Sequence, residues 1–261
     1  MNSFQRYTLR MDTLYTALFV LILIGIAGLG WFSFILYKKQ RRNSEKVIRE
    51  VYKASNEIKK SISHSYYQSE AYAQLIQLLD FKASLPPTRG WAASPDLLLT
   101  IYETISRTKP SLVVELGSGV STLVAAKSGA KKVVSLDGSK EYAAKTREML
   151  KEHRVRGVEV RFAALLPYVN GLTWYDISVI KDLKKIDLLI VDGPPGNNNP
   201  ESRYPALKEF KDKLSPRAVV ILDDVNREGE RKLAEDFAAA LPNHELIILN
   251  HEKGAAIISP R

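Results

Sequence analysis

Acidic and small polar residues follow short apolar runs at several points of the chain, with a spacing that suits a nucleotide-like ligand. Val113–Thr122 reads V-V-E-L-G-S-G-V-S-T, a β-branched run followed by a glycine turn and the start of a helical pattern. This order lets backbone N–H groups approach a ligand at a helix N-terminus. Asp137 ends the next apolar run, twenty residues beyond Gly117. A carboxylate at that place suits the hydroxyl groups of a ribose.

Two later apolar runs also end in aspartate. Asp192 follows L-L-I-V, and the pair Asp223-Asp224 follows V-V-I-L. Aspartate is common in turns and at helix N-caps, so each of these residues alone has a structural explanation. The carboxyl ends of parallel strands meet at one edge of a sheet, however, and Glu115 and Asp137 would lie at the same edge. We therefore predict a functional cleft there.

The elements that would position these residues alternate between strand and helix. The expected strands are Leu112–Leu116, Lys132–Asp137, Val158–Ala163, Ile186–Asp192, Ala218–Asp223, Glu245–Asn250 and Ala255–Ser259. The expected helices are a first one from Ser94-Pro95-Asp96 to Arg107, then Ser121–Ser128, Ser139–His153, Asp176–Leu183, Tyr204–Leu214 and Glu228–Leu241. Alternation of this kind predicts an α/β fold, a Rossmann-like, mostly parallel seven-stranded sheet with helices on both faces. The short turn His251–Gly254 predicts an antiparallel last strand.

The N-terminal region contains a candidate membrane span. Leu14–Tyr37 is 24 residues long and carries no charge, with Tyr15, Trp31 and Tyr37 near its ends. A bilayer needs roughly 20 apolar residues in a helix, and interfacial aromatic residues fit such a span. A cleaved signal peptide is the alternative, but its apolar region is typically about 7–15 residues long. We favour a retained single-pass anchor.

The charges that flank this span predict its orientation. Five basic residues follow it and two precede it, namely Lys38, Lys39, Arg41, Arg42 and Lys46 against Arg6 and Arg10. The positive-inside rule then places the N-terminus outside and the rest of the chain in the cytoplasm, at the inner membrane. Residues 1–63 hold +7 of the net charge of +9. The remainder is nearly neutral, which argues against a nucleic-acid partner.

The span is followed by a helical pattern from Ser44 to about Leu79. Apolar residues recur there at intervals of three and four, at Val47, Val51, Ala54, Ile58 and Ile62. We interpret this segment as a stalk helix that packs on the globular domain. A homodimer formed through the stalk as a short parallel coiled coil is the alternative. Leu85–Gly90, with its Pro86-Pro87, ends the pattern.

The glycine turn distinguishes between two nucleotide ligands. A dinucleotide site needs G-x-G-x-x-G, and here Thr122 stands in the third glycine position. The pattern E-x-G-x-G, with Asp137 after the next strand, instead resembles the class I S-adenosylmethionine-dependent methyltransferases. R-G-W-A-A-S-P-D (Arg89–Asp96), V-D-G-P-P-G and R-Y-P-A-L resemble a bacterial branch of that family over about residues 70–261.

The resemblance implies roles for individual residues. It implies that the methionine part of S-adenosylmethionine is held by Glu115, Gly117, Ser118, Gly119 and Ser121, and that Asp137 binds its ribose. It also implies the reaction, which is alignment of an acceptor oxygen or nitrogen with the methyl group and removal of the acceptor's proton. Asp192 and Asp224 are the candidate catalytic bases. We expect the loop from Gly193 to Ser202, rich in turn residues, to cover the acceptor.

The carboxylates Asp192, Asp223 and Asp224 also allow a metal hypothesis. Catechol-type O-methyltransferases bind a divalent cation with an Asp and an Asp-Asn pair at the corresponding strand ends, and oxygen ligands suit Mg²⁺. Those enzymes have a lysine as general base three residues after the first aspartate, where this chain has Pro195. We therefore keep Mg²⁺ as an optional cofactor. The alternative is that Asp192 contacts the cofactor while Asp223 and Asp224 cap a turn.

These observations predict a membrane-anchored methyltransferase with a small-molecule, glycan or lipid-linked acceptor. We divide the chain into residues 1–42 (tail, transmembrane helix 14–37 and basic flank), 43–88 (stalk) and 89–261 (methyltransferase domain). The alternative function is that of a non-catalytic, membrane-tethered interaction protein with a vestigial nucleotide fold. An NAD-dependent oxidoreductase is disfavoured by Thr122. The chain has no cysteine, which excludes disulfides and thiolate metal sites.

Overall fold

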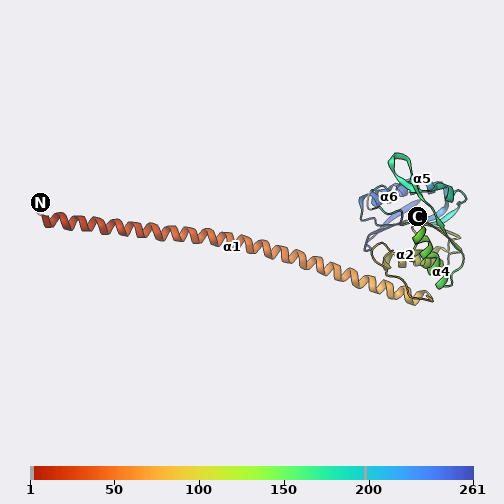
Figure 1. Ribbon diagram of the computed structural model, residues 1–261, viewed down its shortest axis with the longest axis horizontal. Helices are drawn as coiled ribbons and strands as arrows, with labels where there is room; N and C mark the ends of the chain where they lie inside the picture. Colours follow the sequence, from red (N-terminus) through yellow and green to blue (C-terminus); the bar gives the residue numbers. More distant parts are fainter. Residues whose placement is uncertain (1–2, 197–198) are drawn as a thin grey trace. The chain divides into compact units, whose positions relative to one another are not determined.

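The computed structural model describes residues 3–196 and 199–261. Its chain forms two compact units, Met1–Ser63 and His64–Arg261. One helix, α1 (Ser3–Leu78), makes up the first unit and supplies the first residues of the second (Figure 1). Among the described residues, α1 contains the one segment that is long and apolar enough to cross a membrane. Arg6 and Arg10, used above to predict orientation, have side chains outside the described part.

The second unit alternates strands and helices as the sequence predicts. Its helices are α2 (Pro95–Thr108), α3 (Val120–Lys127), α4 (Lys140–Glu152), α5 (Pro205–Phe210) and α6 (Glu228–Ala240). The strands of its main sheet are β1 (Leu112–Leu116), β2 (Lys132–Asp137), β3 (Val158–Phe162), β6 (Ile186–Val191), β7 (Leu214–Asp223), β8 (His244–Leu249) and β9 (Ala255–Pro260).

The sheet has seven strands in the order β3-β2-β1-β6-β7-β9-β8. β1 pairs in parallel with both β2 and β6, so the order of the strands reverses beside β1. β9 is antiparallel to both of its neighbours, β7 and β8, which confirms the prediction for the last strand. In a sheet of this kind, ligands bind outside the carboxyl ends of the strands at the reversal point.

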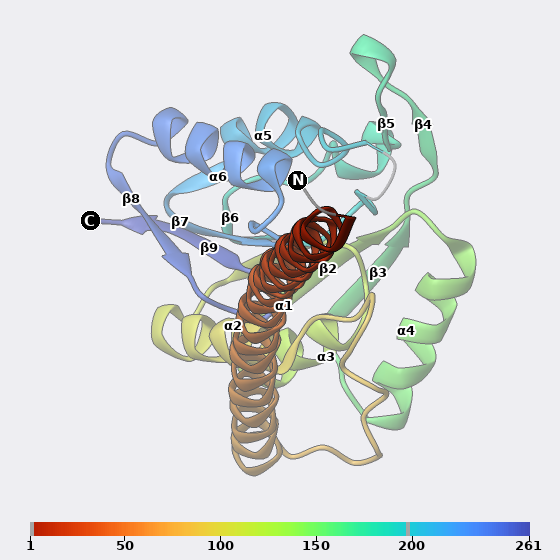
Figure 2. The ribbon, with the colours of Figure 1, turned by 90° about the vertical axis from the view of Figure 1, so that its left-hand side faces the viewer.

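Alternate side chains of the buried strands form two cores, one on each face of the sheet. Val113 packs with Ile101 of α2 and Val124 of α3. Val114, on the opposite face, belongs to a cluster with Phe210 of α5 and Phe237 of α6. Figure 2 shows α2, α3 and α4 on one side of the sheet and α5 and α6 on the other. The predicted Rossmann-like sheet with helices on both faces is thereby confirmed.

Two predicted helices were wrong in extent. The expected helix Asp176–Leu183 is a single 3₁₀ turn, Ile177–Ile180, in which the Asp176 carboxylate accepts a hydrogen bond from the N–H of Ser178. The expected helix Tyr204–Leu214 ends early, in α5 and the 3₁₀ turn Lys211–Lys213, because Leu214 already belongs to β7. A register shift between Ile186 and Leu188 accommodates the early start of β7 and its Pro216.

A small hairpin was not predicted. It consists of β4 (Leu165–Pro167) and β5 (Thr173–Tyr175), which pair antiparallel outside the main sheet. Figure 2 shows it projecting beyond the end of β3. The far end of the hairpin is solvent-exposed, whereas Trp174 and Tyr175 in β5 are buried in the core of the α5–α6 face. The hairpin therefore carries an aromatic pair back to the strand ends.

Candidate functional site

The glycine turn after β1 fits closely against the end of β6. Gly117 has φ +96°, and a Cβ on it would lie 3.0 Å from the backbone oxygen of Asp192. A side chain there would require both left-handed backbone and displacement of β6, so glycine is needed. Gly119, two residues on at the N-terminus of α3, has open space where a Cβ would point. The turn is thus supported on one side and accessible on the other, as a cradle for a ligand requires.

Glu115 lies below this turn and is completely buried. Its Oε2 accepts hydrogen bonds from the hydroxyls of Thr122, at 2.5 Å, and Ser135, at 2.7 Å. Thr122 in turn accepts the N–H of Gly119, at 3.0 Å. Burial raises the pKa of Glu115 to about 7, although these hydroxyls lower it. Glu115 and Thr122 therefore position the glycine turn from inside, a function of Thr122 that the sequence analysis missed.

Two of the predicted cofactor residues meet at the ends of β1 and β2. The Ser118 hydroxyl donates to Oδ2 of Asp137 at 2.5 Å, and the Ser118 N–H donates to the same oxygen at 3.3 Å. The other carboxylate oxygen of Asp137 accepts the N–H of Ser139 at 2.8 Å. Asp137 is thereby held at the mouth of the glycine turn, where a ribose would need it. Ser121 lies buried in the first turn of α3.

The carboxylates at the ends of β6 and β7 come together as predicted. Oxygen atoms of Asp192, Asp223 and Asp224 lie within 4.8 Å of one another. Asp224 has φ +65°, a left-handed conformation that non-glycine residues adopt at a cost and that is often found at functional sites. The loop from Gly193 to Ser202, which was predicted to cover the acceptor, is described apart from residues 197 and 198. Its Pro195 and Gly196 lie beside Asp192 in the lining of a cavity.

Arg203 is the cation at the centre of this cluster. It is only 4% exposed. Its Nη2 lies 2.9 Å from Oδ2 of Asp224 and 3.3 Å from Oδ1 of Asp192. Its other nitrogens donate to the backbone oxygens of Pro194 and Asp223. This role could not be predicted from the sequence, because Arg203 lies eleven residues from Asp192 and 21 from Asp224 along the chain.

The geometry limits how the carboxylates could hold a metal. Three carboxylates within reach of one point have the right chemistry for Mg²⁺, which binds oxygen at about 2.0–2.1 Å. An ion bound to Asp192 and Asp224 would stand next to the Arg203 guanidinium, which donates to both. An ion would therefore compete with Arg203 for Oδ1 of Asp192 and Oδ2 of Asp224.

The protonation of two of the carboxylates is shifted. Burial raises the pKa of Asp192 to about 6, with Arg203 acting against the shift. Burial and the neighbouring Asp192 and Asp224 also raise the pKa of Asp223 well above its usual range. Among the described residues, neither carboxylate oxygen of Asp223 has a hydrogen-bond partner, and Lys253 Nζ is 3.9 Å away. Asp192 is thus tuned to accept a proton near neutral pH.

A cavity of about 300 Å³ opens beside this cluster. Its lining comes from four parts of the chain and consists of Gly90, Trp91, Asp192, Pro195, Gly196, Arg203, Asp224, Arg227 and Lys253. Trp91 is 74% exposed, so its indole ring is available to a ligand. The size and mixture of polar and aromatic groups suit a small organic ligand or one ring of a larger one.

The segment that carries Trp91 is held in place by Asp96. This buried carboxylate accepts hydrogen bonds from the Ser94 hydroxyl at 2.5 Å, the Gln68 amide at 2.6 Å and the Glu252 N–H at 2.8 Å. Burial opposes ionisation, but the hydrogen bonds outweigh it and lower the pKa of Asp96. The motif R-G-W-A-A-S-P-D therefore ties the end of α1 and the β8–β9 turn to the rim of the cavity.

Tyr175, from the unpredicted hairpin, also reaches the strand ends. A Cβ on Gly193 would collide with the Tyr175 hydroxyl, so the two residues are in contact at the end of β6. Burial raises the pKa of Tyr175, and it stays a neutral phenol. The short strands of the hairpin have no periodic pattern, so only the structure reveals this residue.

Comparisons with known proteins agree with this architecture. Residues 114–225, fewer than half of the chain, match a family model described as "Methyltransferase domain". The structure resembles an O-methyltransferase from Bacillus cereus in complex with SAH (TM-score 0.52, 19% identity, 77% of this chain and 97% of that chain). It also resembles the O-methyltransferase TomG from Streptomyces achromogenes, involved in tomaymycin synthesis, in complex with SAM (TM-score 0.53, 16% identity, 76% and 95%).

A third similar structure is the SAH-bound methyltransferase PaMTH1 from Podospora anserina (TM-score 0.52, 19% identity, 74% of this chain and 87% of that chain). No functionally curated protein matches the chain significantly in sequence. The fold is therefore the Rossmann-like methyltransferase fold, and the domain match supports methyl transfer as the activity.

Proposed function

We propose that this protein is a membrane-anchored methyltransferase that uses S-adenosylmethionine. The observation that carries the proposal is the convergence of Gly117–Gly119, Asp137 and Asp192 at the carboxyl ends of β1, β2 and β6. The open backbone at Gly119 fits an approaching methionine group, and the held carboxylate of Asp137 fits a ribose. Three structures with this fold are bound to SAM or SAH, which supports the same cofactor here.

The residues of the cavity suit the acceptor side of the reaction. Bound S-adenosylmethionine supplies a methyl group activated by the adjoining sulfonium. The chain would place the acceptor in the cavity beside Asp192. This carboxylate is mostly buried and has a pKa of about 6. Asp192 would take the proton that the acceptor oxygen loses when this oxygen receives the methyl group. Asp224, which is held by Arg203 and Arg227, would orient the acceptor.

The polar groups favour a neutral acceptor with hydroxyl groups over a strongly anionic one. Arg203 and Arg227 face the carboxylates of Asp192, Asp224 and Glu230, so their charges are already compensated. Carboxylates that accept and guanidinium groups that donate together match hydroxyls, which do both. The exposed indole of Trp91 offers a flat apolar surface for a ring. We therefore propose O-methylation of a glycan, a lipid-linked glycan or a related small molecule.

We propose that the N-terminal helix anchors the protein, so that the reaction takes place at a membrane surface. The Thr13–Leu78 part of α1 contains a window of the length and composition of a membrane span, with none of that window buried. Basic residues after the span, among them Lys38, Lys39, Arg41 and Arg42, favour a cytoplasmic catalytic domain, where S-adenosylmethionine is made. Membrane extraction at alkaline pH, followed by protease protection, tests the anchor and its orientation.

Transfer of radiolabelled methyl groups tests the activity. The full chain is incubated with labelled S-adenosylmethionine and with glycan and membrane-lipid extracts, beside the variant Asp192→Asn. We expect label in a glycan-containing fraction with the native chain and a loss of on the order of 100-fold with the variant, the usual size of a general-base contribution. Binding of the cofactor without transfer to any fraction would favour a non-catalytic protein.

A further inference from the structure

The part of α1 that starts at the end of the membrane span carries a stripe of exposed, mostly apolar side chains. Its residues recur every eleven positions in three series, which are Leu36, Val47 and Ile58, then Gln40, Val51 and Ile62, then Asn43 and Ala54. Three turns of an α-helix take about 11 residues, so all eight side chains lie along one face. Each large apolar member is between 49% and 63% exposed. We call these eight residues the stalk stripe.

The opposite face is basic. Six cations are spaced by four, four, three, four and seven residues, at Lys38, Arg42, Lys46, Arg49, Lys53 and Lys60. The same periodicity keeps them together and about half a turn away from the stalk stripe. A helix whose two faces differ in this way has one face built to be covered. The large apolar side chains of the stalk stripe are exposed along the helix itself.

Lipid is a poor partner for the stripe. At a rise of 1.5 Å per residue, Val47 lies about 15 Å beyond Tyr37 along the helix, and Ile62 about 37 Å beyond it. The helix could meet the bilayer again only by bending sharply after the span. Sharp bends occur at proline, glycine or a bulge. The sequence from Trp31 to Leu85 contains no glycine and no proline, and α1 is unbroken over its described residues.

A second copy of the chain fits the stripe best. We infer that the stalk stripes of two copies pack together as a parallel, in-register helix pair. Two copies anchored in one membrane with the same orientation have parallel helices. Their stripes lie at the same height above the membrane and can face each other. An eleven-residue repeat suits long contact between two such helices. Ala54 allows close approach, while the basic faces point away from each other.

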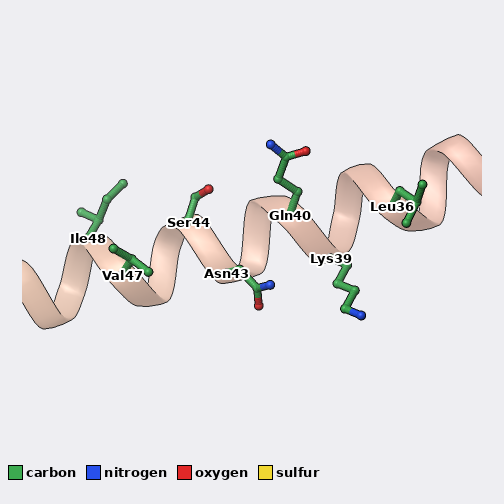
Figure 3. A pocket seen from close by; sticks show the side chains of 7 residues that line it. All are labelled: Leu36, Lys39, Gln40, Asn43, Ser44, Val47 and Ile48. Carbon is green, nitrogen blue, oxygen red and sulfur yellow. The ribbon is translucent and has the colours of Figure 1, made fainter.

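The groove near the membrane supports the same partner. Leu36, Gln40, Ser44 and Ile48 form one ridge, and Lys39, Asn43 and Val47 form the next, with an open groove between them (Figure 3). Helices pair by placing the ridge of one into the groove of the other. Gln40 and Asn43 have side-chain amides, which donate and accept, so each can pair with its own copy. Polar residues of this kind fix register in helix pairs.

The absence of cysteine makes a direct test possible. Single cysteines are introduced into the full chain as Val51→Cys and Ala54→Cys, in the stripe, and as Asn56→Cys, an exposed position on the basic face. The proteins are reconstituted into vesicles at a high lipid-to-protein ratio and oxidised. Disulfides need Cα atoms within about 4.4–6.8 Å, which an in-register pair provides only in the stripe.

We expect disulfide-linked dimers to form on the order of tenfold faster from Val51→Cys and Ala54→Cys than from Asn56→Cys, given that distance requirement. Equal rates at all three positions, or no dimer from the two stripe positions, would overturn the inference. The inference rests on the proposed anchor, and resistance to alkaline extraction is measured on the same vesicles. Since methyl transfer is assayed separately, failure of the dimer and failure of the proposed enzyme remain distinguishable.

Discussion

Arg203 and Asp224 form a buried ion pair in which Nη2 of the guanidinium lies 2.9 Å from Oδ2 of the carboxylate. The pair joins the loop before α5 to the end of β7, and Asp192 at the end of β6 shares the same guanidinium nitrogen. Because the three residues are distant in sequence and nearly excluded from solvent, this contact fixes the relative positions of the strand ends around the cavity.

Removing the Arg203 charge should destabilise the domain. Arg203→Met leaves Asp192 and Asp224 without their shared buried cation, and breaking a buried ion pair typically costs about 3–5 kcal/mol. Urea unfolding followed by near-ultraviolet circular dichroism measures this change in the free energy of unfolding. Arg227→Met is the control, because Arg227 is 45% exposed and also contacts Asp224, and we expect it to cost about 1 kcal/mol or less. Equal losses in the two variants would contradict the role of Arg203.

Glu115 should make stability depend on pH. Its pKa is about 7 in the folded chain against 4.5 for the free side chain. The folded state therefore keeps a proton that the unfolded state releases, and the stabilisation present below pH 4.5 is lost as pH rises to about 7. The loss amounts to about 3 kcal/mol, at about 1.4 kcal/mol per pKa unit. In Glu115→Gln, whose side chain does not titrate, we expect this part of the pH dependence to vanish. Parallel stability profiles for the two proteins would contradict the raised pKa.

Asp192 should control the pH dependence of methyl transfer. As a base it must be ionised, so the rate should rise with pH through an apparent pKa near 6. Asp192→Asn should lose most of the rate constant kcat and retain the affinity for S-adenosylmethionine. Asp223→Asn serves as the comparison, because Asp223 is buried behind the cavity and does not line it. A rate for Asp192→Asn equal to that of the native chain would show that another residue is the general base.

Methyl transfer should persist after removal of divalent metal ions. The reason is that Arg203 already provides Asp192 and Asp224 with a cation. We expect the rate after EDTA treatment and desalting to stay within about twofold of the untreated rate. Removal of a metal that acts as a Lewis acid would lower the rate far more, because such a metal contributes several kcal/mol. Loss of activity that Mg²⁺ restores would contradict this prediction and favour the metal hypothesis for the three carboxylates.

The main sheet could be predicted because each buried strand is a short β-branched run with a turn residue after it. Leu112–Leu116 and Lys132–Asp137 are correct at both ends. The hairpin of β4 and β5 could not be predicted, because three-residue strands with Pro167 and exposed leucines have no usable period. The helix expected at Asp176–Leu183 did not form as predicted because this segment also lacks a full apolar face. Only Ile180 and Leu183 are buried there.

The candidate site shows the same division between local and distant contacts. Gly117, Asp137 and Asp192 stand directly at strand ends, so the sheet prediction was enough to bring them together. Arg203 reaches the site from a loop and Tyr175 from a hairpin. Their presence at the site is visible only in the folded chain. Thr122 was read as evidence against a dinucleotide, while its hydrogen bonds to Glu115 and Gly119 appear only in three dimensions.

Calorimetric titration of the full chain with S-adenosylmethionine tests the central claim most directly. The native chain should bind one equivalent, and Asp137→Ala should bind on the order of tenfold or more weakly, because it loses a charged hydrogen-bond acceptor for the ribose worth about 1.5–3 kcal/mol. Lys109→Ala, in the turn after α2 and away from the strand ends, should bind as the native chain does. Absence of binding to the folded native chain, or equal affinity in Asp137→Ala, would contradict the account.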